Sequence, residues 1–206
     1  MSDDQTEGEN IQLRDGSQMS IRPVGPEDRA LLAAAFEELS FESRHRRFFA
    51  AMSELDAEQL SYLTQVDHHD HEALVALDAG SGSAAGVARF ARIDDDVAEP
   101  AIVVVDRWQR LGLGSILLER LAVRALEEGV GRFRARVLAD NQEAIGLFEQ
   151  LGEVVLRASG PELDLEVSLS EPEVLGLRLR EFLRAAASGL LAPARAAIAR
   201  RGTNQP

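Results

Sequence analysis

The sequence predicts an α+β fold built on a mixed sheet, and three observations support it. Short segments rich in β-branched and apolar residues recur along the chain, as strands require. Other segments repeat their apolar residues at helical spacing. From residue 73 onward the expected order is three strands, a helix, a strand, a helix and a strand. This order is typical of an α+β domain with one mixed sheet.

The first third of the chain is predicted to supply a hairpin and three helices. Strands over 11–13 and 19–24 flank an Asp15–Gly16 turn. Pro26 and the two acidic residues after it start a helix, because proline is accepted in a first turn and carboxylates complement the helix dipole. The other helices are expected over 41–50 and over 56–66, the latter opened by a capping box of Asp56 and Gln59.

Four strands are expected in the middle of the chain, over 73–79, 84–93, 98–105 and 132–138. In the last of them three arginines alternate with Phe133, Ala135 and Val137. A basic ladder for nucleic acid is one interpretation of Arg132, Arg134 and Arg136. A solvated or carboxylate-paired sheet face is the favoured one.

The most informative segment is Val103–Gly114, where an apolar run ends in a polar turn and then in Gln109-x-x-Gly112-x-Gly114. The apolar residues of 115–128 recur at helical spacing, so these glycines lie where a helix begins. A helix N-terminus offers unpaired N–H groups to an anion. The other Gly-x-Gly pairs, at Gly80 and Gly129, fit a loop and a helix stop.

This pattern resembles the pyrophosphate loop of the GNAT superfamily of N-acetyltransferases, whose motif Gln/Arg-x-x-Gly-x-Gly/Ala joins a central strand to a helix. The resemblance continues in a strand over 133–138, a helix opened by Asn141 and the pair Leu151–Gly152 before the last strands. It covers roughly residues 18–169. It implies a GNAT-like, mostly antiparallel central sheet flanked by helices, and acetyl-CoA as the acyl donor.

Within that superfamily the chain is most similar to the bacterial Pat-type protein lysine acetyltransferases, which implies a protein lysine as acceptor. The residues that carry this likeness are Ile21–Pro23, Pro26–Asp28, Glu42–Arg44, Arg47–Phe49, Leu63–Asp67, Ala73–Ala76, Asp106, Trp108 and Gln109. Two alternatives stay open. The acceptor is a small amine, or the chain is a GNAT-fold sensor that binds acyl-CoA without turnover.

The resemblance also implies the site residues. Glu99, within Ala98–Ile102, matches the general base of Pat-type enzymes, which removes a proton from the acceptor amine. Asp94, Asp95 and Asp96 are its rivals, although three successive carboxylates more often form a solvated turn. The implied cofactor contacts are backbone groups of Ile102, Val103 and Val104, the N–H groups of Gln109, Arg110, Leu111, Gly112, Leu113, Gly114 and Ser115, an arginine at Arg107 or Arg110, and Asn141, which also fits a simple helix N-cap.

Several residues depart from the family pattern. Pro100 removes an N–H from its strand, so it must lie at an edge, a bulge or the strand's start. Phe148 stands where many GNAT enzymes have a tyrosine that protonates the leaving thiolate, and Glu153 replaces a common phenylalanine. The aromatic residues of the first helices either line the acceptor cleft or pack the core, and the core is favoured. They are Phe36, Phe48, Phe49 and Tyr62.

Composition limits the function further. The 206 residues are 45% hydrophobic and carry a formal net charge of −13, which disfavours nucleic acid and modestly favours a cationic substrate. Solubility alone explains most of these carboxylates. No apolar run reaches the ~20 residues of a membrane span and the start is polar and acidic, so we expect a cytoplasmic protein without a membrane partner. With no cysteine, acyl transfer must be direct attack in a ternary complex or use a weaker nucleophile.

Two further features complete the expectations. The cluster Asp67–His71 contains potential zinc ligands, but it is contiguous rather than spaced, so we expect a polar loop and no metal. The resemblance ends before Glu171. Residues 171–206 contain six arginines and three glutamates, which give this tail a formal charge of +3. We expect a disordered acidic N-terminus (1–10), a GNAT domain (11–170) and a helical extension (171–206). The extension docks on the acidic body or mediates a homodimer, with an anionic membrane as the alternative.

Overall fold

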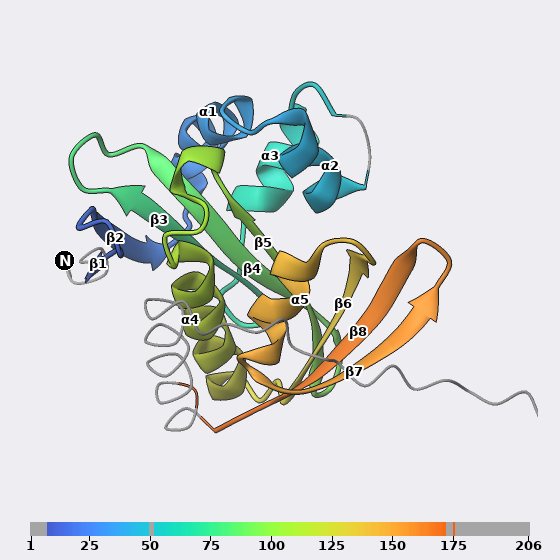
Figure 1. Ribbon diagram of the computed structural model, residues 1–206. Helices are drawn as coiled ribbons and strands as arrows, with labels where there is room; N and C mark the ends of the chain where they lie inside the picture. The colour runs from blue at the N-terminus through green and yellow to red at the C-terminus, as the bar shows by residue number, and fades with distance from the viewer. Residues whose placement is uncertain (1–7, 50–51, 172–174, 176–206) are drawn as a thin grey trace, which may run out of the picture.

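The computed structural model describes residues 8–49, 52–171 and 175, and this part is a mixed α+β domain around one eight-stranded sheet (Figure 1). The strand order is β1-β2-β3-β4-β5-β6-β8-β7, and each pair is antiparallel except β5 with β6. The predicted fold class is therefore confirmed. The strands are β1 (Glu9–Gln12), β2 (Gln18–Pro23), β3 (His71–Asp78), β4 (Ala84–Asp94), β5 (Val97–Val104), β6 (Arg132–Leu138), β7 (Gly152–Ser159) and β8 (Glu162–Leu169).

Helices cover both faces of this sheet, and the alternation of side chains along β4 shows which helices lie on which face. Ala88 and Phe90 are buried in the core beneath α4 and α5, whereas Val87 packs with the residues of α1 and α3. The helices are α1 (Arg29–Glu37), α2 (Phe41–Phe48), α3 (Ala57–Thr64), α4 (Leu113–Glu127) and α5 (Gln142–Glu149), with short 3₁₀ turns η1 (Pro26–Asp28) and η2 (Asp106–Trp108).

The sheet opens between β5 and β6. These parallel strands pair only at Val97–Arg132 and Ala98–Phe133, after which they diverge. From Glu99 onward β5 therefore has a partner strand on one side only. Pro100 lies in this stretch, opposite Phe90 of β4, which is the edge position that its missing N–H predicted.

Most element boundaries agree with the sequence to within two residues, and the capping box of α3 is confirmed. Asp56 accepts a hydrogen bond from the Gln59 N–H (2.8 Å) and Gln59 accepts one from the Asp56 N–H (2.9 Å). The predicted disordered segment, residues 1–10, is too long, because β1 begins at Glu9 and includes Asn10. The Glu9 carboxylate pairs with Arg120 of α4 (2.6 Å), which holds the start of the strand.

The arginines of β6 form a carboxylate-paired face, as favoured from the sequence. Arg132 pairs with Asp96 of the β4–β5 turn (2.9 Å), and Arg134 pairs with Glu166 of β8 (3.4 Å). Arg136 lies between Glu162 and Asp164, at 3.3 Å from each. In the tail, Leu175 is buried in the main core, and the remainder of the predicted extension and its dimer lie outside the described residues.

Candidate active site

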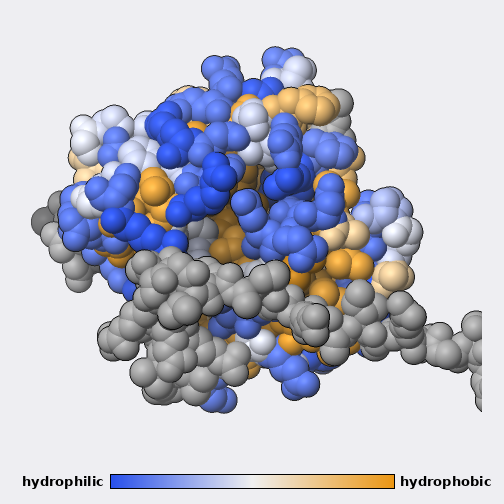
Figure 2. All heavy atoms as spheres, viewed as in Figure 1, coloured by the Kyte–Doolittle hydropathy of each residue, from blue (hydrophilic) through white to orange (hydrophobic). Residues whose placement is uncertain are grey.

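A cleft of about 1130 Å³ occupies the opening between β5 and β6. Figure 2 shows it as a hollow with apolar residues at its floor and hydrophilic residues at its rim. Its walls are β5 from Glu99 to Val104, the loop before α4, β6, α5 and the outer side of α2. It is slightly larger than the usual range for small-ligand pockets, which fits a long, extended ligand.

The loop between η2 and α4 forms one end of this cleft and presents unpaired backbone N–H groups. Arg110 (φ 61°) and Gly112 (φ 95°) both adopt left-handed backbone conformations, and Gly112 is the N-cap of α4. Within the described chain, the N–H groups of residues 110–115 have no hydrogen-bond acceptor. Six successive free donors at the start of a fifteen-residue helix are the arrangement that can hold an anion, and the glycine spacing predicts such a site.

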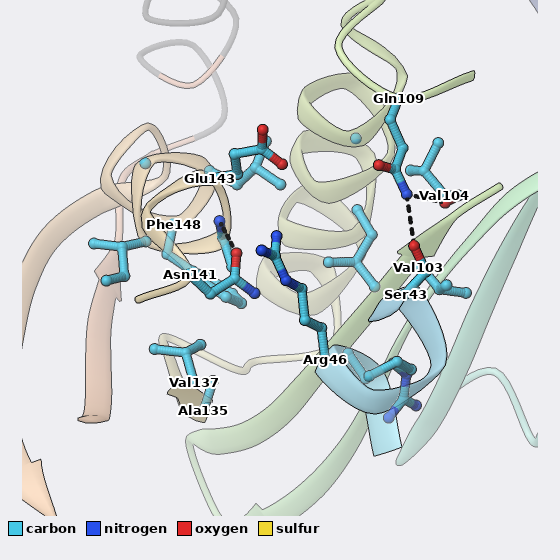
Figure 3. A pocket seen from close by; sticks show the side chains of 18 of the residues that line it. Ser43, Arg46, Val103, Val104, Gln109, Ala135, Val137, Asn141, Glu143 and Phe148 are labelled. Atoms are coloured by element: carbon cyan, nitrogen blue, oxygen red, sulfur yellow. Dashed lines mark hydrogen bonds between the residues drawn. The ribbon is translucent and has the colours of Figure 1, made fainter. Parts of the chain in front are cut away.

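Gln109 supports this loop with its side chain. Its Nε2 donates to the Val104 carbonyl (2.9 Å) and to Ser43 Oγ of α2 (3.1 Å), as the dashed lines in Figure 3 show. Its own N–H donates to the Asp106 carbonyl (3.2 Å). The Gln109 N–H, expected from the sequence to contact the ligand, is used within the loop in this structure, and the run of free N–H groups begins at Arg110.

Asp106 joins the loop to the start of α2. The sequence did not predict this contact. Its carboxylate accepts hydrogen bonds from the Ser40 N–H (2.9 Å), Ser40 Oγ (2.6 Å) and Ser43 Oγ (3.0 Å). Burial acts to raise the pKa of Asp106, but these hydrogen bonds outweigh it and hold the pKa below its usual value. The only hint of it in the sequence was that Asp106 is one of the residues that resemble Pat-type enzymes.

The free edge of β5 offers a further set of backbone groups. The Val105 N–H donates to Ala85 of β4 (2.9 Å), and bonding direction alternates along an antiparallel strand. Val103 therefore also bonds toward β4, while the groups of Ile102 and Val104 point into the cleft. The prediction for Ile102 and Val104 agrees with this geometry. The backbone groups of Val103 are used in the β4–β5 ladder, although the residue also lines the cleft.

Helix α5 forms the opposite wall of the cleft. Asn141 caps this helix by accepting from the Ala144 N–H (3.2 Å) and also lines the cleft, so both interpretations of this residue fit (Figure 3). Phe148, where many family members have tyrosine, is buried at 3% exposure in the same wall. Beside it, burial raises the pKa of Glu149.

The remaining predicted site residues divide between the cleft and the interior. Glu99 is exposed in the cleft, and its rivals Asp94–Asp96 form the end of β4 and the turn after it. Arg110 lines the cleft, while Arg107 pairs with Glu38 outside it. The side chains of Leu111 and Leu113 pack toward the core, so these residues face the loop only through their backbone. Gly112, Gly114 and Ser115 line the cleft.

The aromatic residues of the first helices serve two purposes. Phe36 and Phe48 pack edge to face with ring centroids 5.6 Å apart and belong to the core, as favoured. Phe49 lines the cleft, and Tyr62 is 57% exposed with its ring against Arg89 (4.6 Å). The prediction that these aromatic residues pack in the core is thus confirmed for Phe36 and Phe48 only.

The Asp67–His71 segment is a polar loop whose imidazoles go to separate partners. His68 bonds to Glu72 (2.8 Å), His69 to Glu128 (2.5 Å) and His71 to Arg89. Among the described residues, no group of three or more histidine, aspartate or glutamate side chains converges as a metal site. In the same part of the chain, no helix is long and apolar enough to cross a membrane.

Comparison with known proteins places this geometry in context. The model of the acetyltransferase (GNAT) family matches residues 31–152. The chain is 36% identical over 166 residues to Acetyltransferase Pat of Mycolicibacterium smegmatis, which covers 80% of this chain and 48% of that protein. The chain therefore spans about half the length of this curated relative.

Two solved structures extend the comparison. The GNAT domain of S. lividans PAT matches with a TM-score of 0.73 and 32% identity, over 79% of this chain and 97% of that one. The structure of yncA from Salmonella typhimurium, which contains its cofactor acetyl-CoA, shares the fold at a TM-score of 0.59 and 21% identity, over 74% of this chain and 95% of that one.

Proposed function

The chain belongs to the GNAT family of acetyltransferases, and we propose that it transfers the acetyl group of acetyl-CoA to lysine side chains of proteins. One observation carries this proposal. Free N–H groups at residues 110–115 lie at the end of a cleft that also exposes the edge of β5 and the Glu99 carboxylate. The protein acceptor rests on the likeness to Pat proteins.

Acetyl-CoA supplies the activated acyl group, and the cleft provides a fitting position for each of its parts. The pyrophosphate would lie against the N–H groups of residues 110–115, where the helix dipole favours negative charge. The pantetheine arm would run along β5 and bond to Ile102 and Val104 as an added strand does. Arg110 and Asn141 would contact the same ligand from the rim.

The chemistry is direct attack within a ternary complex. The lysine amine attacks the thioester carbonyl, the carbon–sulfur bond breaks, and the proton of the amine passes to Glu99, through a water molecule. A cleft-facing N–H of β5 would stabilise the developing oxyanion. The coenzyme A thiolate takes its proton from water, because Phe148 cannot supply one. The products are an acetylated lysine and coenzyme A.

The proposal includes a cytoplasmic location, protein acceptors and no catalytic metal. Glu99 as base is supported by its place in the cleft wall, on the strand next to the opening of the sheet.

The test is to incubate the protein with acetyl-CoA and a lysate of its own organism, following coenzyme A release and lysine acetylation by mass spectrometry. Acetylation of specific lysines that is lost in Glu99→Gln supports the proposal and identifies the targets. Binding of coenzyme A with no acetylated lysine contradicts it and favours a sensor or a small amine acceptor.

A further inference from the structure

Side-chain hydrogen bonds join the first turn of α2 to η2 and the loop after it, here called the coenzyme loop. The Asp106 carboxylate accepts from Ser40 Oγ (2.6 Å), Ser43 Oγ (3.0 Å) and the Ser40 N–H (2.9 Å). Gln109 Nε2 donates to Ser43 Oγ (3.1 Å), as Figure 3 shows. These four residues form what we call the α2 bridge. It joins segments that are 66 positions apart in the chain.

Each donor and acceptor of the α2 bridge has one assignable role. The Ser43 hydroxyl has a single proton, and a carboxylate can only accept, so this proton points to Asp106 and the Ser43 oxygen accepts from Gln109. The Ser40 hydroxyl likewise donates to Asp106, and it accepts from the Ser43 N–H (3.2 Å) as the N-cap of α2. The bridge therefore needs a carboxylate at position 106 and a hydroxyl at position 43.

Packing alone gives α2 little to fix its position. Every residue of α2 is described, and no side chain among them is buried. Phe48 packs against Phe36 from a partly buried position, and Arg44 donates to the carbonyls of Leu39 (3.1 Å) and Ser53 (3.0 Å). A short helix gains most of its stability from a buried apolar face. Because α2 lacks such a face, its place against the sheet depends strongly on the α2 bridge.

The position of α2 determines the shape of the acceptor side of the cleft. Arg46, Arg47 and Phe49 line the cleft from the last turn of α2 and its C-cap, and Figure 3 shows Arg46 extending into it. Burial lowers the pKa of Arg47 and the charge of Glu99 acts to raise it, so α2 lies close to the proposed base. A displacement of about 1 Å at such a place can cost about 10²-fold in rate.

The coenzyme loop, at the other end of the α2 bridge, has a conformation that a bound anion would stabilise. Arg110 follows Gln109 directly and has φ 61°, a left-handed conformation that is unfavourable for a residue with a Cβ atom. An anion that binds the aligned N–H groups of residues 110–115 would favour this state over any other. Binding there would also fix Gln109 and Asp106, which hold α2.

We propose that Asp106 and Ser43 are positioning residues, which dock α2 on the coenzyme loop and so assemble the acceptor side of the cleft. They act through α2 and its cleft residues rather than on the reacting atoms. Coupling between two binding sites is reciprocal, so coenzyme and acceptor should each tighten the binding of the other by the same factor. The inference rests on the proposed acetyltransferase function.

The first experiment measures acetyl transfer at saturating acetyl-CoA, so that weaker coenzyme binding does not contribute. The acceptor is a lysine peptide from the targets of the lysate experiment, and the chain has no lysine, so all acetyllysine comes from the peptide. Ser43→Ala and Asp106→Asn should each lower kcat/KM for the peptide at least about tenfold. Ser43→Thr keeps the hydroxyl and should stay within about threefold of wild type.

Asp78→Asn is the matched control for this experiment. Asp78 also accepts from a serine hydroxyl, that of Ser81 (2.6 Å), but it lies at the β3–β4 turn, and the variant should keep the wild-type kcat/KM. Values for Ser43→Ala and Asp106→Asn within about threefold of wild type would overturn the proposal.

The second experiment needs no acceptor, so it separates the α2 bridge from the proposed lysine acceptor. Amide hydrogen exchange of residues 44–49 is measured with and without saturating coenzyme A. The coenzyme should slow this exchange at least about fivefold in wild type, Ser43→Thr and Asp78→Asn, but not in Ser43→Ala or Asp106→Asn. Equal slowing in all these proteins, or slowing confined to residues 110–115, would overturn the α2 bridge even if lysines are acetylated. Slowing that depends on the bridge, without acetylated lysine, would support it and contradict only the lysine acceptor.

Discussion

The two sides of the cleft bind by different means. On the proposed coenzyme side, the N–H groups of residues 110–115 and the free edge of β5 would supply the contacts, so recognition there would depend on the backbone. On the proposed acceptor side, the chemistry would depend on a charged side chain, the Glu99 carboxylate. Substitutions should therefore act on the coenzyme side mainly through backbone conformation, and on the acceptor side through the loss of a functional group.

The largest expected effect is on the acceptor side. Glu99→Gln removes the general base while keeping the size of the side chain, and should lower kcat by about 10²–10⁴-fold with the Kd for acetyl-CoA unchanged. Steady-state kinetics and calorimetry measure the two quantities. Glu153→Gln, an exposed glutamate of β7, is the control. A kcat for Glu99→Gln within about threefold of wild type would remove Glu99 from the mechanism.

The next effect tests the backbone of the coenzyme side. Gly112 has φ 95°, and a left-handed conformation costs a non-glycine residue about 1–2 kcal/mol. Gly112→Ala should weaken acetyl-CoA binding at least tenfold. Gly129→Ala is a matched control, because Gly129 follows α4 with φ 80° and a Cβ added there would meet no atom within 4 Å. The control should lose about 1 kcal/mol of stability and bind acetyl-CoA normally; equal Kd changes in both variants would contradict a role specific to the loop.

A smaller effect is expected where a side chain supports the backbone. Gln109→Ala removes the hydrogen bonds to Val104 and Ser43, each worth roughly 1 kcal/mol, and should raise the Kd for acetyl-CoA about fivefold. Gln12→Ala, which removes a bond at the β1–β2 turn, should leave the Kd unchanged. Titration calorimetry distinguishes these results, and an unchanged Kd in Gln109→Ala would show that the loop holds its shape without this support.

The smallest expected effect concerns the pH dependence of folding stability. Burial and the charge of Arg89 lower the pKa of His71 from 6.5 to about 4. The unfolded chain then binds more protons than the folded one between these values, so stability present above pH 6.5 is lost as pH falls toward 4. The partial exposure of His71 reduces the contribution to about 1 kcal/mol. His71→Gln keeps an acceptor for Arg89 but has no titrating imidazole. When the pH falls from 7 to 4.5, its free energy of unfolding, measured with urea, should decrease by about 1 kcal/mol less than that of wild type. Identical decreases in the two proteins would contradict this pKa.

The sequence predicted the coenzyme side better than the acceptor side, and the reason is physical. The loop is defined by glycines at fixed local spacing, and Gly112, with φ 95°, cannot be replaced without strain. The contact between Asp106 and Ser40 joins residues that are 66 positions apart, so no local pattern could reveal it. Whether the backbone groups of Val103 point toward β4 or into the cleft depends on the register of β5 against β4, which no local pattern gives.

The central claim is that the N–H groups of residues 110–115 hold the pyrophosphate of acetyl-CoA. Backbone amide NMR shifts on titration with coenzyme A test this claim directly. We expect saturable shifts that are largest at Gly112, Leu113 and Gly114, and smaller at Gln109, whose N–H is bonded to Asp106. Shifts confined to other surfaces, with the amides of residues 110–115 unchanged at saturation, would contradict the account.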